Sequence, residues 1–189
     1  MSDLKLDAAH SALLLMDFQT PIVENYAPDR EKLLAATSGL LAAARQRGMR
    51  VIYVVVGFRP GFPEISRRNK SFSGLKERGG IASDVHKAVA PRGEEPTVMK
   101  HRVGAFLGTD LDMLLRAHDI HTLVLCGIST SGVVLSTLRH AADADYELLV
   151  VRDCCADPDA EVHACLMDKV FPRQATVVNS AELRTSLNS

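Results

Sequence analysis

The sequence predicts an α/β protein in which a parallel sheet carries helices on both faces. Short apolar runs of strand length alternate along the chain with longer segments whose apolar residues recur at helical spacing. The run VIYVVV at 51–56 is continuously apolar and mostly β-branched, as expected for a strand buried on both faces. Such alternation gives parallel strands joined by right-handed crossovers. The 189 residues, 47 % of them hydrophobic, suffice for one domain with a full core.

The composition excludes several classes of function. The formal net charge is −1, so no overall field attracts nucleic acid or an acidic membrane. Aromatic residues make up 5 % of the chain and Trp is absent, which argues against base-stacking surfaces. No apolar stretch approaches the roughly 20 residues that span a bilayer, and the N-terminal segment lacks the basic start of a signal peptide. We therefore expect a soluble, cytoplasmic protein with no nucleic-acid or membrane partner.

The first part of the chain is expected to hold two strands separated by one long helix. Residues 11–16 (SALLLM) form the first strand, which Asp17 closes, and Pro21 interrupts the chain soon afterwards. Asp29 is the expected N-cap of a helix that ends at Gly48. The strand VIYVVV follows.

Residues 57–80 are expected to form a long loop rich in Gly, Pro and Ser. Two glutamates, Glu64 and Glu77, accompany an excess of basic side chains, namely Arg59, Arg67, Arg68, Lys70, Lys76 and Arg78. Long loops inside compact domains are usually functional or disordered. Two interpretations stay open: a solvated surface or oligomer contact, and a lid or wall that favours an anionic ligand.

The remainder is expected to alternate between short strands and helices. Apolar runs predict strands at 97–99, 121–127, 147–151 and 175–178. Helices are expected from Thr109, with a capping box to Asp112, from Thr130, and from an N-cap pair at Asp157 and Pro158. The inward face of the last of these comprises Val162, Cys165, Leu166 and Val170. The segment 85–90 is compatible with a short strand or a helical turn, and the C-terminus with a terminal helical turn.

Three of the strand ends carry polar or reactive groups. Asp17 closes the first strand, Lys100 closes TVMK, and the strand LVLCGI runs into the turn STSG. The carboxyl ends of parallel strands share one edge of the sheet, where ligands bind. A carboxylate and an ammonium in a partly buried pocket perturb each other's pKa values, so Asp17 could act as a general acid or base while Lys100 sets its charge. The alternative is an ion pair that only ties two strand ends together.

The turn after the strand LVLCGI is a second candidate for ligand binding. The first N–H groups of a helix have no partner within the helix. The N–H groups of residues 129–133 could therefore hold an oxyanion or a substrate carboxylate.

No cofactor or metal site is expected. DFQTP follows the first strand instead of G-x-G-x-x-G, and a P-loop is absent. The histidines show no ligand spacing. His118 and His121 are expected on the surface or in the core, and His163 on a solvated helix face.

The four cysteines are expected to be reduced, because they form no C-x-x-C pair. Cys126 and Cys165 are expected in the core. Cys154 and Cys155 close an apolar run, so they could reach the rim of a site at the carboxyl edge.

Three segments together resemble the isochorismatase-like (cysteine hydrolase) family, which includes isochorismatases, nicotinamidases and N-carbamoyl amidohydrolases. They are LLLMDFQ with Asp17, MKHRVGAF with Lys100, and GISTSGVVLSTLRHAADADYELLVVRDCCAD. The resemblance runs from about residue 11 to 178 and implies a single isochorismatase-like hydrolase domain over residues 1–189. It further implies a Rossmann-like three-layer αβα sandwich with a six-stranded parallel sheet, a homo-oligomer (dimer or tetramer), and a cis peptide bond between Ile128 and Ser129.

Many members of this family use an Asp–Lys–Cys triad. The resemblance assigns the Asp to Asp17 and the Lys to Lys100 as catalytic residues. The Cys normally lies in a pattern like G-[IV]-x-T-x-x-C-V, which places Val133 of GISTSGVV at the nucleophile position. Valine has no nucleophile. The Asp-x-His-type metal site of nicotinamidases also has no counterpart in VVVGFRPGFPEIS.

A site without a thiol can still be catalytic, because the isochorismatases of the family cleave a vinyl ether by delivering a proton to the vinyl carbon. A protonated Asp17 would suit this step. The turn of those enzymes resembles G-V-Y-A-H, whereas this chain has G-I-S-T-S, which argues against isochorismate itself. The resemblance thus implies a hydrolase of a small metabolite, possibly anionic, acting on a vinyl ether or an amide C–N bond. The expected substrate-binding residues are Phe18, Gln19, Phe106, Ser129, Thr130, Gly132 and Val133.

Two other functions remain open. The missing thiol permits a catalytically silent binding or scaffold protein of the same fold. A phospho-acceptor signalling domain is the third alternative, but such domains need an acidic pair before the acceptor loop, and residues 13–17 supply one carboxylate.

Overall fold

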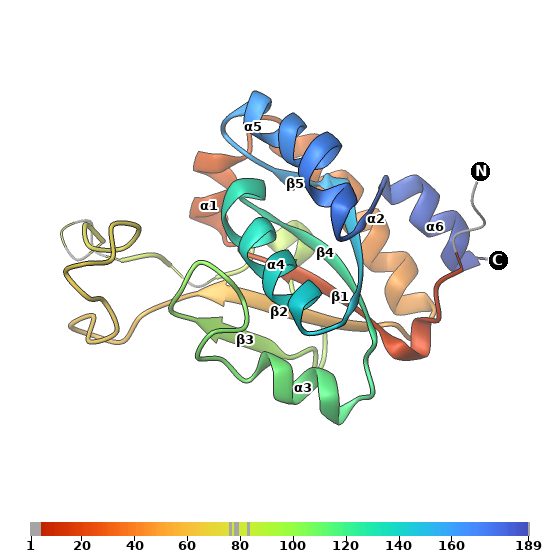
Figure 1. Ribbon diagram of the computed structural model, residues 1–189, viewed down its shortest axis with the longest axis horizontal. Coiled ribbons are helices and arrows are strands. Elements are labelled where there is room, and N and C mark those ends of the chain that lie inside the picture. Colours follow the sequence, from red (N-terminus) through yellow and green to blue (C-terminus); the bar gives the residue numbers. More distant parts are fainter. Residues whose placement is uncertain (1–4, 76, 78–79, 83, 189) are drawn as a thin grey trace.

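The computed structural model describes residues 5–75, 77, 80–82 and 84–188. Six parallel strands form one sheet in the order β3-β2-β1-β4-β5-β6, with helices on both faces (Figure 1). This confirms the predicted α/β class and the six-stranded parallel sheet. The strands are β1 Ser11–Met16, β2 Arg50–Val56, β3 Thr97–Lys100, β4 Thr122–Ile128, β5 Glu147–Ala156 and β6 Thr176–Val178.

The two faces of the sheet bury separate apolar layers. Helices α2 (Arg30–Gln46) and α6 (Ser180–Asn188) pack on the face that carries Leu13 and Leu15 of β1. Helices α3 (Leu111–Ala117) and α4 (Leu135–Asp143) pack on the face that carries Leu14 and Met16. Every residue of β1 is buried because both faces are covered. Among the described residues, no helix is both long and apolar enough to cross a membrane.

The strand order changes direction at the centre of the sheet. From β1 the chain proceeds outward to β2 and β3, and from β4 it proceeds outward on the other side to β5 and β6. In open α/β sheets, ligands bind in the crevice above such a point, at the carboxyl ends of the strands. The ends of β1 and β4 therefore form the expected location of a site.

The first helix was not predicted. Helix α1 (Thr20–Tyr26) begins one residue before Pro21, and the expected interruption at Pro21 is wrong. A proline in the first helical turn lacks an N–H that would have no partner there anyway. The next helix agrees with expectation, because the side chain of Asp29 accepts from the N–H of Lys32 and Gly48 follows the helix with a φ of 68°.

Two predicted helix starts are wrong by two residues. Helix α3 begins at Leu111, and Thr109 Oγ1 accepts from the Leu111 N–H at 3.3 Å instead of forming a capping box to Asp112. Helix α5 (Ala160–Cys165) is capped by Asp159 and not by Asp157. The carboxylate of Asp157 is used elsewhere, as described below.

Helix α5 also presents a different face from the one predicted. A π-helical turn, Leu166–Val170, follows it directly, and the wider turn rotates the side chains relative to an α-helical pattern. As a result Leu166 and Met167 are buried, whereas Val162 and Cys165 are exposed. The expectation that Cys165 lies in the core is therefore wrong.

The segment between Val85 and Val89 contains both of the alternatives left open for it. Val85 forms an isolated bridge to Gln19, and Lys87–Val89 is a 3₁₀ turn.

Strand β5 is longer than predicted, because its pairing with β4 resumes at Gly127 and Cys155 after a register shift.

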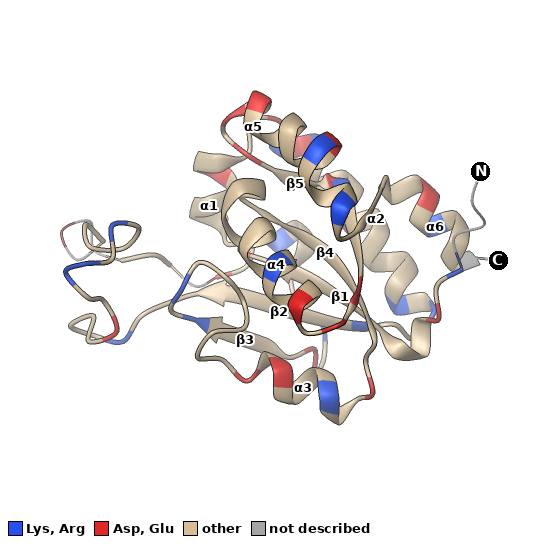
Figure 2. Cartoon of the chain, in the orientation of Figure 1, with Lys and Arg blue, Asp and Glu red and all other residues tan. Residues whose placement is uncertain are grey.

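Residues 57–75 form a loop without helix or strand that extends away from the sheet (Figure 1). Lys and Arg recur along it (Figure 2), although Lys76 and Arg78 lie outside the described residues. Phe58 packs against Phe62 and Phe72 at its base. The loop itself is confirmed, and its use as a lid or an oligomer contact stays a prediction.

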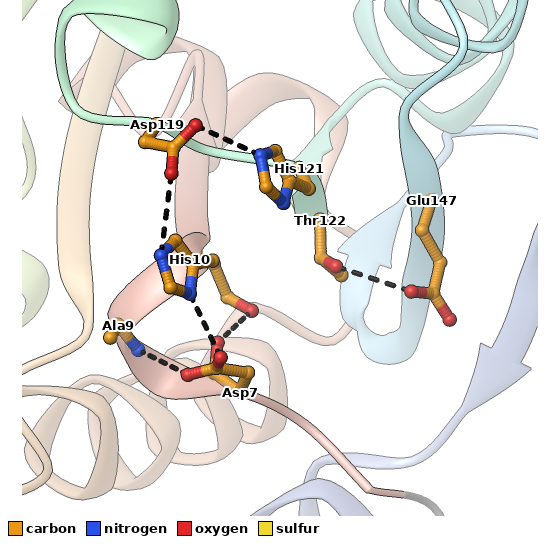
Figure 3. Close-up of polar contacts among 8 residues, drawn as sticks. Asp7, Ala9, His10, Asp119, His121, Thr122 and Glu147 are labelled. Carbon is orange, nitrogen blue, oxygen red and sulfur yellow. Dashed lines mark hydrogen bonds and ion pairs between the residues drawn. The ribbon is translucent and has the colours of Figure 1, made fainter.

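A polar cluster joins the amino-terminal ends of the central strands (Figure 3). The N–H of His121 donates to His10 O, and the N–H of Glu147 donates to His121 O. The imidazole rings of His10 and His121 stack with centroids 5.3 Å apart. Asp119 contacts both rings, at 3.4 Å from His10 Nε2 and 3.0 Å from His121 Nε2.

Candidate active site

Asp17 and Lys100 meet at the carboxyl edge of the sheet. Asp17 follows β1 and Lys100 ends β3, so the end of β2 lies between them. Two strand spacings amount to about 10 Å, a gap that the long lysine side chain bridges. Lys100 Nζ lies 2.9 Å from Asp17 Oδ2, and the two side chains are 2 % and 8 % exposed. Lys100 Nζ also donates to Arg102 O at 3.1 Å.

The second carboxylate oxygen of Asp17, Oδ1, is buried without a hydrogen bond to any residue that the structure describes. Most buried polar atoms are hydrogen-bonded, so this atom marks a place for a donor from a ligand or water. Burial raises the pKa of Asp17 to about 6, although Lys100 opposes the shift. A carboxyl group with such a pKa can accept or donate a proton near neutral pH.

The turn after β4 folds back onto the end of its own strand. The peptide bond between Ile128 and Ser129 is cis, as the family resemblance implied, and a π-helical turn, Thr130–Val134, leads into α4. A Cβ atom on Gly127 would lie 2.9 Å from Val134 Cγ2 and 3.2 Å from Met16 O. Only glycine therefore allows the turn to approach β4 and β1 so closely.

Val133 packs against the end of β4 as a result of this turn. Its Cγ1 atom would be 3.2 Å from a Cβ on Gly127, and Gly127 pairs with Met16, the residue before Asp17. Val133 is 2 % exposed. The turn thus buries an apolar side chain at the end of β4, the strand next to the one that Asp17 follows.

Several N–H groups of the turn already have acceptors within the protein. The N–H of Gly132 donates to Ser129 O at 3.2 Å. The N–H of Ser131 donates to Asp157 Oδ2 at 2.8 Å. These two donors are therefore not free for a substrate oxyanion, which the sequence pattern alone did not reveal. A Cβ on Gly132 would lie 2.7 Å from Ser129 Oγ, so this position also requires glycine.

Two functional candidates were missed from the sequence, Asp157 and His163. Asp157 is buried just after β5 and accepts from the Ser131 N–H. His163 Nδ1 lies 2.8 Å from Thr130 Oγ1, and burial lowers the pKa of His163. The expected solvated position of His163 is therefore wrong. Unlike Asp17, Asp157 does not follow an uninterrupted apolar run, because Arg152 and Asp153 lie within β5.

Three of the expected substrate-binding residues, Phe18, Gln19 and Phe106, lie outside the turn. Phe18 is buried in the layer under α2. Gln19 Nε2 donates to Val56 O at 2.9 Å and to Ala82 O at 2.7 Å, while its Oε1 accepts from the Val56 N–H. Phe106 stacks on His140 in the last turn of α4, with centroids 4.5 Å apart. Ser129, Thr130, Gly132 and Val133 all lie in the turn after β4, the strand next to β1, whereas Phe106 packs on α4. Their role in substrate binding stays a prediction.

The buried thiols are poor nucleophiles. Burial raises the pKa of Cys126 and of Cys155 far above the ordinary value, and a thiol must ionise to react. Cys154 is also buried, as expected for a residue at the end of an apolar run. Within the described part of the chain, His, Cys, Asp and Glu form no group of three that could hold a metal ion.

A cavity of about 320 Å³ opens beside the turn, on the β5 side. Its lining includes Lys32 from α2, Arg152 from β5, Asp157 and His163. Neither Asp17 nor Lys100 lines it. The cavity is therefore a neighbour of the proposed catalytic pair and not its substrate pocket.

The chain matches the isochorismatase domain family over residues 11–182. The uncharacterized isochorismatase family protein YecD of Escherichia coli O157:H7 is 32 % identical over 187 residues, which cover 97 % of this chain and 100 % of that protein. The maleamate amidohydrolase of Pseudomonas putida is 29 % identical over 186 residues, covering 93 % of this chain and 86 % of the enzyme.

Solved structures agree with these sequence matches. An isochorismatase family protein from Burkholderia thailandensis superposes with a TM-score of 0.87 at 28 % identity, covering 98 % of both chains. N-carbamoylsarcosine amidase from Thermoplasma acidophilum gives 0.74 at 27 % identity, covering 90 % of this chain and 96 % of the enzyme. The fold, the matched length and the arrangement of the carboxyl edge together show that this chain belongs to the isochorismatase family of hydrolases.

Proposed function

We propose that this protein hydrolyses a small metabolite at an amide C–N or vinyl ether bond, with Asp17 as general acid or base and without a cysteine nucleophile. The observation that carries the proposal is the asymmetry of the Asp17 carboxylate. Lys100 Nζ engages Oδ2, whereas Oδ1 is buried without a hydrogen-bond partner among the described residues. This arrangement supports an oriented group with one oxygen reserved for the reaction.

The proposed role of Lys100 is to orient Asp17 and to stabilise its ionised form. With a pKa of about 6, Asp17 has both protonation states populated near neutral pH. For an amide, ionised Asp17 takes a proton from the attacking water and returns it to the leaving nitrogen. For a vinyl ether, protonated Asp17 delivers its proton to the vinyl carbon, and water adds to the resulting oxocarbenium ion while returning a proton to Asp17. The hemiketal then collapses, its C–O bond breaks, and a carbonyl compound and an alcohol are released.

The proposal assigns the nucleophile position of the family to Val133. Val133 is buried against Gly127 next to the end of β1, and the raised pKa values of Cys126 and Cys155 argue against either thiol as a substitute. Water is therefore the attacking group, and no acyl-enzyme forms. Ser129, Thr130 and Gly132 are proposed to line the substrate side of the turn.

The substrate class is proposed from the relatives and from charge. The names of three relatives describe amide or carbamoyl chemistry: maleamate amidohydrolase, ureidoacrylate amidohydrolase of Stutzerimonas stutzeri, and N-carbamoylsarcosine amidase. The loop that starts at the carboxyl end of β2 carries Arg59, Arg67, Arg68 and Lys70. An anionic substrate fits this charge.

The test is a comparison of the wild-type protein with Asp17→Asn on a panel of maleamate, ureidoacrylate, N-carbamoyl amino acids and a carboxylated vinyl ether. Loss of a general acid–base group typically lowers the rate by 10² to 10⁴-fold, and we expect a loss in that range with an unchanged circular dichroism spectrum. Asp143→Asn, an exposed substitution at the end of α4, is the matched control. Full activity of Asp17→Asn on a substrate of the wild-type protein would refute the role of Asp17.

A catalytically silent binding protein is the second candidate, and the buried Val133 at the nucleophile position favours it. This candidate predicts that a metabolite of the panel raises the melting temperature while no product forms. Turnover that depends on Asp17 excludes it.

A further inference from the structure

We propose that Asp157 and His163 are positioning residues that hold the turn at residues 130 and 131 from the side opposite Asp17. The proposal rests on the proposed function in one respect, because it takes this turn as part of the substrate site. The strand order places β4 between β1 and β5. The turn after β4 is therefore flanked by Asp17 at the end of β1 and by Asp157 at the end of β5.

Asp157 acts as an internal ligand of the turn. Its Oδ2 accepts from the Ser131 N–H at 2.8 Å and its Oδ1 from the Asp159 N–H at 3.2 Å. Asp157 is 6 % exposed. A carboxylate that accepts hydrogen bonds from backbone N–H groups forms charge-assisted hydrogen bonds, which are stronger than neutral ones. A negative charge is also favourable at the start of a helix.

His163 supports the neighbouring residue of the turn. Thr130 is buried, and its Oγ1 lies 2.8 Å from His163 Nδ1. Burial lowers the pKa of His163, so its ring is neutral near pH 7 and Nδ1 can accept the Thr130 proton. His163 belongs to α5, whose N-cap Asp159 also donates its N–H to Asp157. The loop after β5 and helix α5 thus act on the turn as one unit.

This arrangement has a consequence for substrate recognition. Asp157 occupies the Ser131 N–H that an anionic substrate group would otherwise use. This N–H is therefore not available to the anionic group of a substrate. The cavity of about 320 Å³ is lined by both Asp157 and His163, so a small carboxylate from solution has a route to the same place.

The first experiment measures backbone hydrogen exchange of peptides that cover residues 129–135. We expect Asp157→Ala to speed exchange there at least tenfold, while peptides from β1 and β2 stay unchanged. Asp157→Asn keeps one acceptor oxygen and should recover most of the protection. Glu161→Ala, an exposed change in α5, is the matched control. Unchanged exchange in Asp157→Ala, or equal loss in the Ala and Asn variants, overturns the proposal.

The second experiment is chemical rescue of Asp157→Ala by formate, a carboxylate that fits the space left by the substitution. Formate at 100 mM should slow exchange in residues 129–135 at least threefold, whereas chloride at equal ionic strength should not. The wild-type protein should show no formate effect. Equal effects of formate and chloride overturn the assignment of a carboxylate ligand to the turn.

The third experiment uses a substrate that the wild-type protein hydrolyses. Asp157→Ala and His163→Ala should lower kcat by 10 to 100-fold with KM changed less than threefold, and Asp157→Asn should restore most of the rate. The effects of His163→Ala and Thr130→Val should not add, because each removes the same contact. A loosened turn with unchanged kcat overturns the positioning role. Failure of the proposed function is a separate result, namely full activity of Asp17→Asn.

Discussion

Lys100 Nζ contacts one oxygen of Asp17 and leaves the other buried without a hydrogen bond in the described structure. An ion pair that served only to tie β1 and β3 together would gain from a partner for both oxygens, because an unsatisfied buried acceptor costs about 1–3 kcal/mol. Removing charges from water is itself costly. The unpaired oxygen therefore lowers stability, and it does so at the edge of the sheet where the strand order changes direction. A local loss of stability of this kind is expected at a functional site.

Burial of Asp17 predicts a specific pH dependence of stability. Its pKa rises from 3.8 to about 6 on folding, so the folded protein binds this proton more tightly than the unfolded chain. The contribution of protonated Asp17 to the free energy of unfolding is present in full below pH 3.8 and is lost as the pH rises to about 6. The free energy of unfolding of the wild-type protein, relative to Asp17→Asn, should fall by about 2 kcal/mol between pH 4 and pH 6.5. Urea unfolding at a series of pH values measures this difference, and a constant difference would contradict the raised pKa.

The same pKa predicts how activity depends on pH. For an amide substrate, Asp17 must be ionised to activate water, so kcat/KM should rise up to about pH 6 and then level off. For a vinyl ether, Asp17 must be protonated, so kcat/KM should fall above about pH 6. Initial rates between pH 4.5 and 8.5 separate the two chemistries. A profile that is flat across this range would show that Asp17 does not transfer the proton.

Val133 offers a test of the missing nucleophile. Val133→Cys replaces one methyl group by a thiol and removes the other, which should cost about 1 kcal/mol of stability. The new thiol would lie beside the Asp17–Lys100 pair, and we expect it to raise hydrolysis of maleamate at least tenfold and to form a covalent adduct detectable by mass spectrometry. Val134→Cys, the next buried residue, is the control and should do neither. Identical behaviour of the two variants would show that position 133 is not the nucleophile position.

The sequence predicted the strands and the meeting of Asp17 with Lys100 for a physical reason. A parallel strand buried on both faces is a continuous apolar run, so the first polar residue after it, as with Asp17, must lie at the carboxyl edge. The rule did not identify Asp157, because Arg152 and Asp153 already follow the apolar run at 147–151, and the Asp–Pro pair fits a helix N-cap. Nothing local marks the π-helical turn Leu166–Val170, because its wider geometry depends on packing against the sheet. The sequence therefore could not predict which face of α5 is buried or where His163 lies.

Gly132 and Ser129 predict a compensating pair of substitutions. A Cβ on Gly132 would lie 2.7 Å from Ser129 Oγ but 4.0 Å from Ser129 Cβ. Gly132→Ala should therefore destabilise the protein by about 1–3 kcal/mol, and adding Ser129→Ala should recover at least half of the loss. Gly39→Ala is the control, because its nearest neighbour is the flexible Arg184 side chain and alanine favours the helix. Thermal unfolding measures all four proteins, and a double variant no better than Gly132→Ala would contradict the predicted clash.

The amino-terminal end of the sheet should respond to pH in the range where histidine titrates. His10 Nδ1 lies 2.8 Å from Asp7 Oδ2 and Nε2 lies 3.4 Å from Asp119 Oδ2. The hydrogen bond that His10 donates to Asp7 raises the pKa of His10 above its usual 6.5. Because the pKa of His10 is raised in the folded state, the contribution of protonated His10 to stability is present in full below pH 6.5. It is lost as the pH rises through the pKa of His10 in the folded protein. The difference in melting temperature between the wild-type protein and His10→Gln should therefore be larger at pH 5.5 than at pH 8.5. His118→Gln, an exposed change outside the cluster, is the matched control. An NMR titration of the His10 ring measures the pKa directly, and a midpoint at or below 6.5 would contradict the role of Asp7.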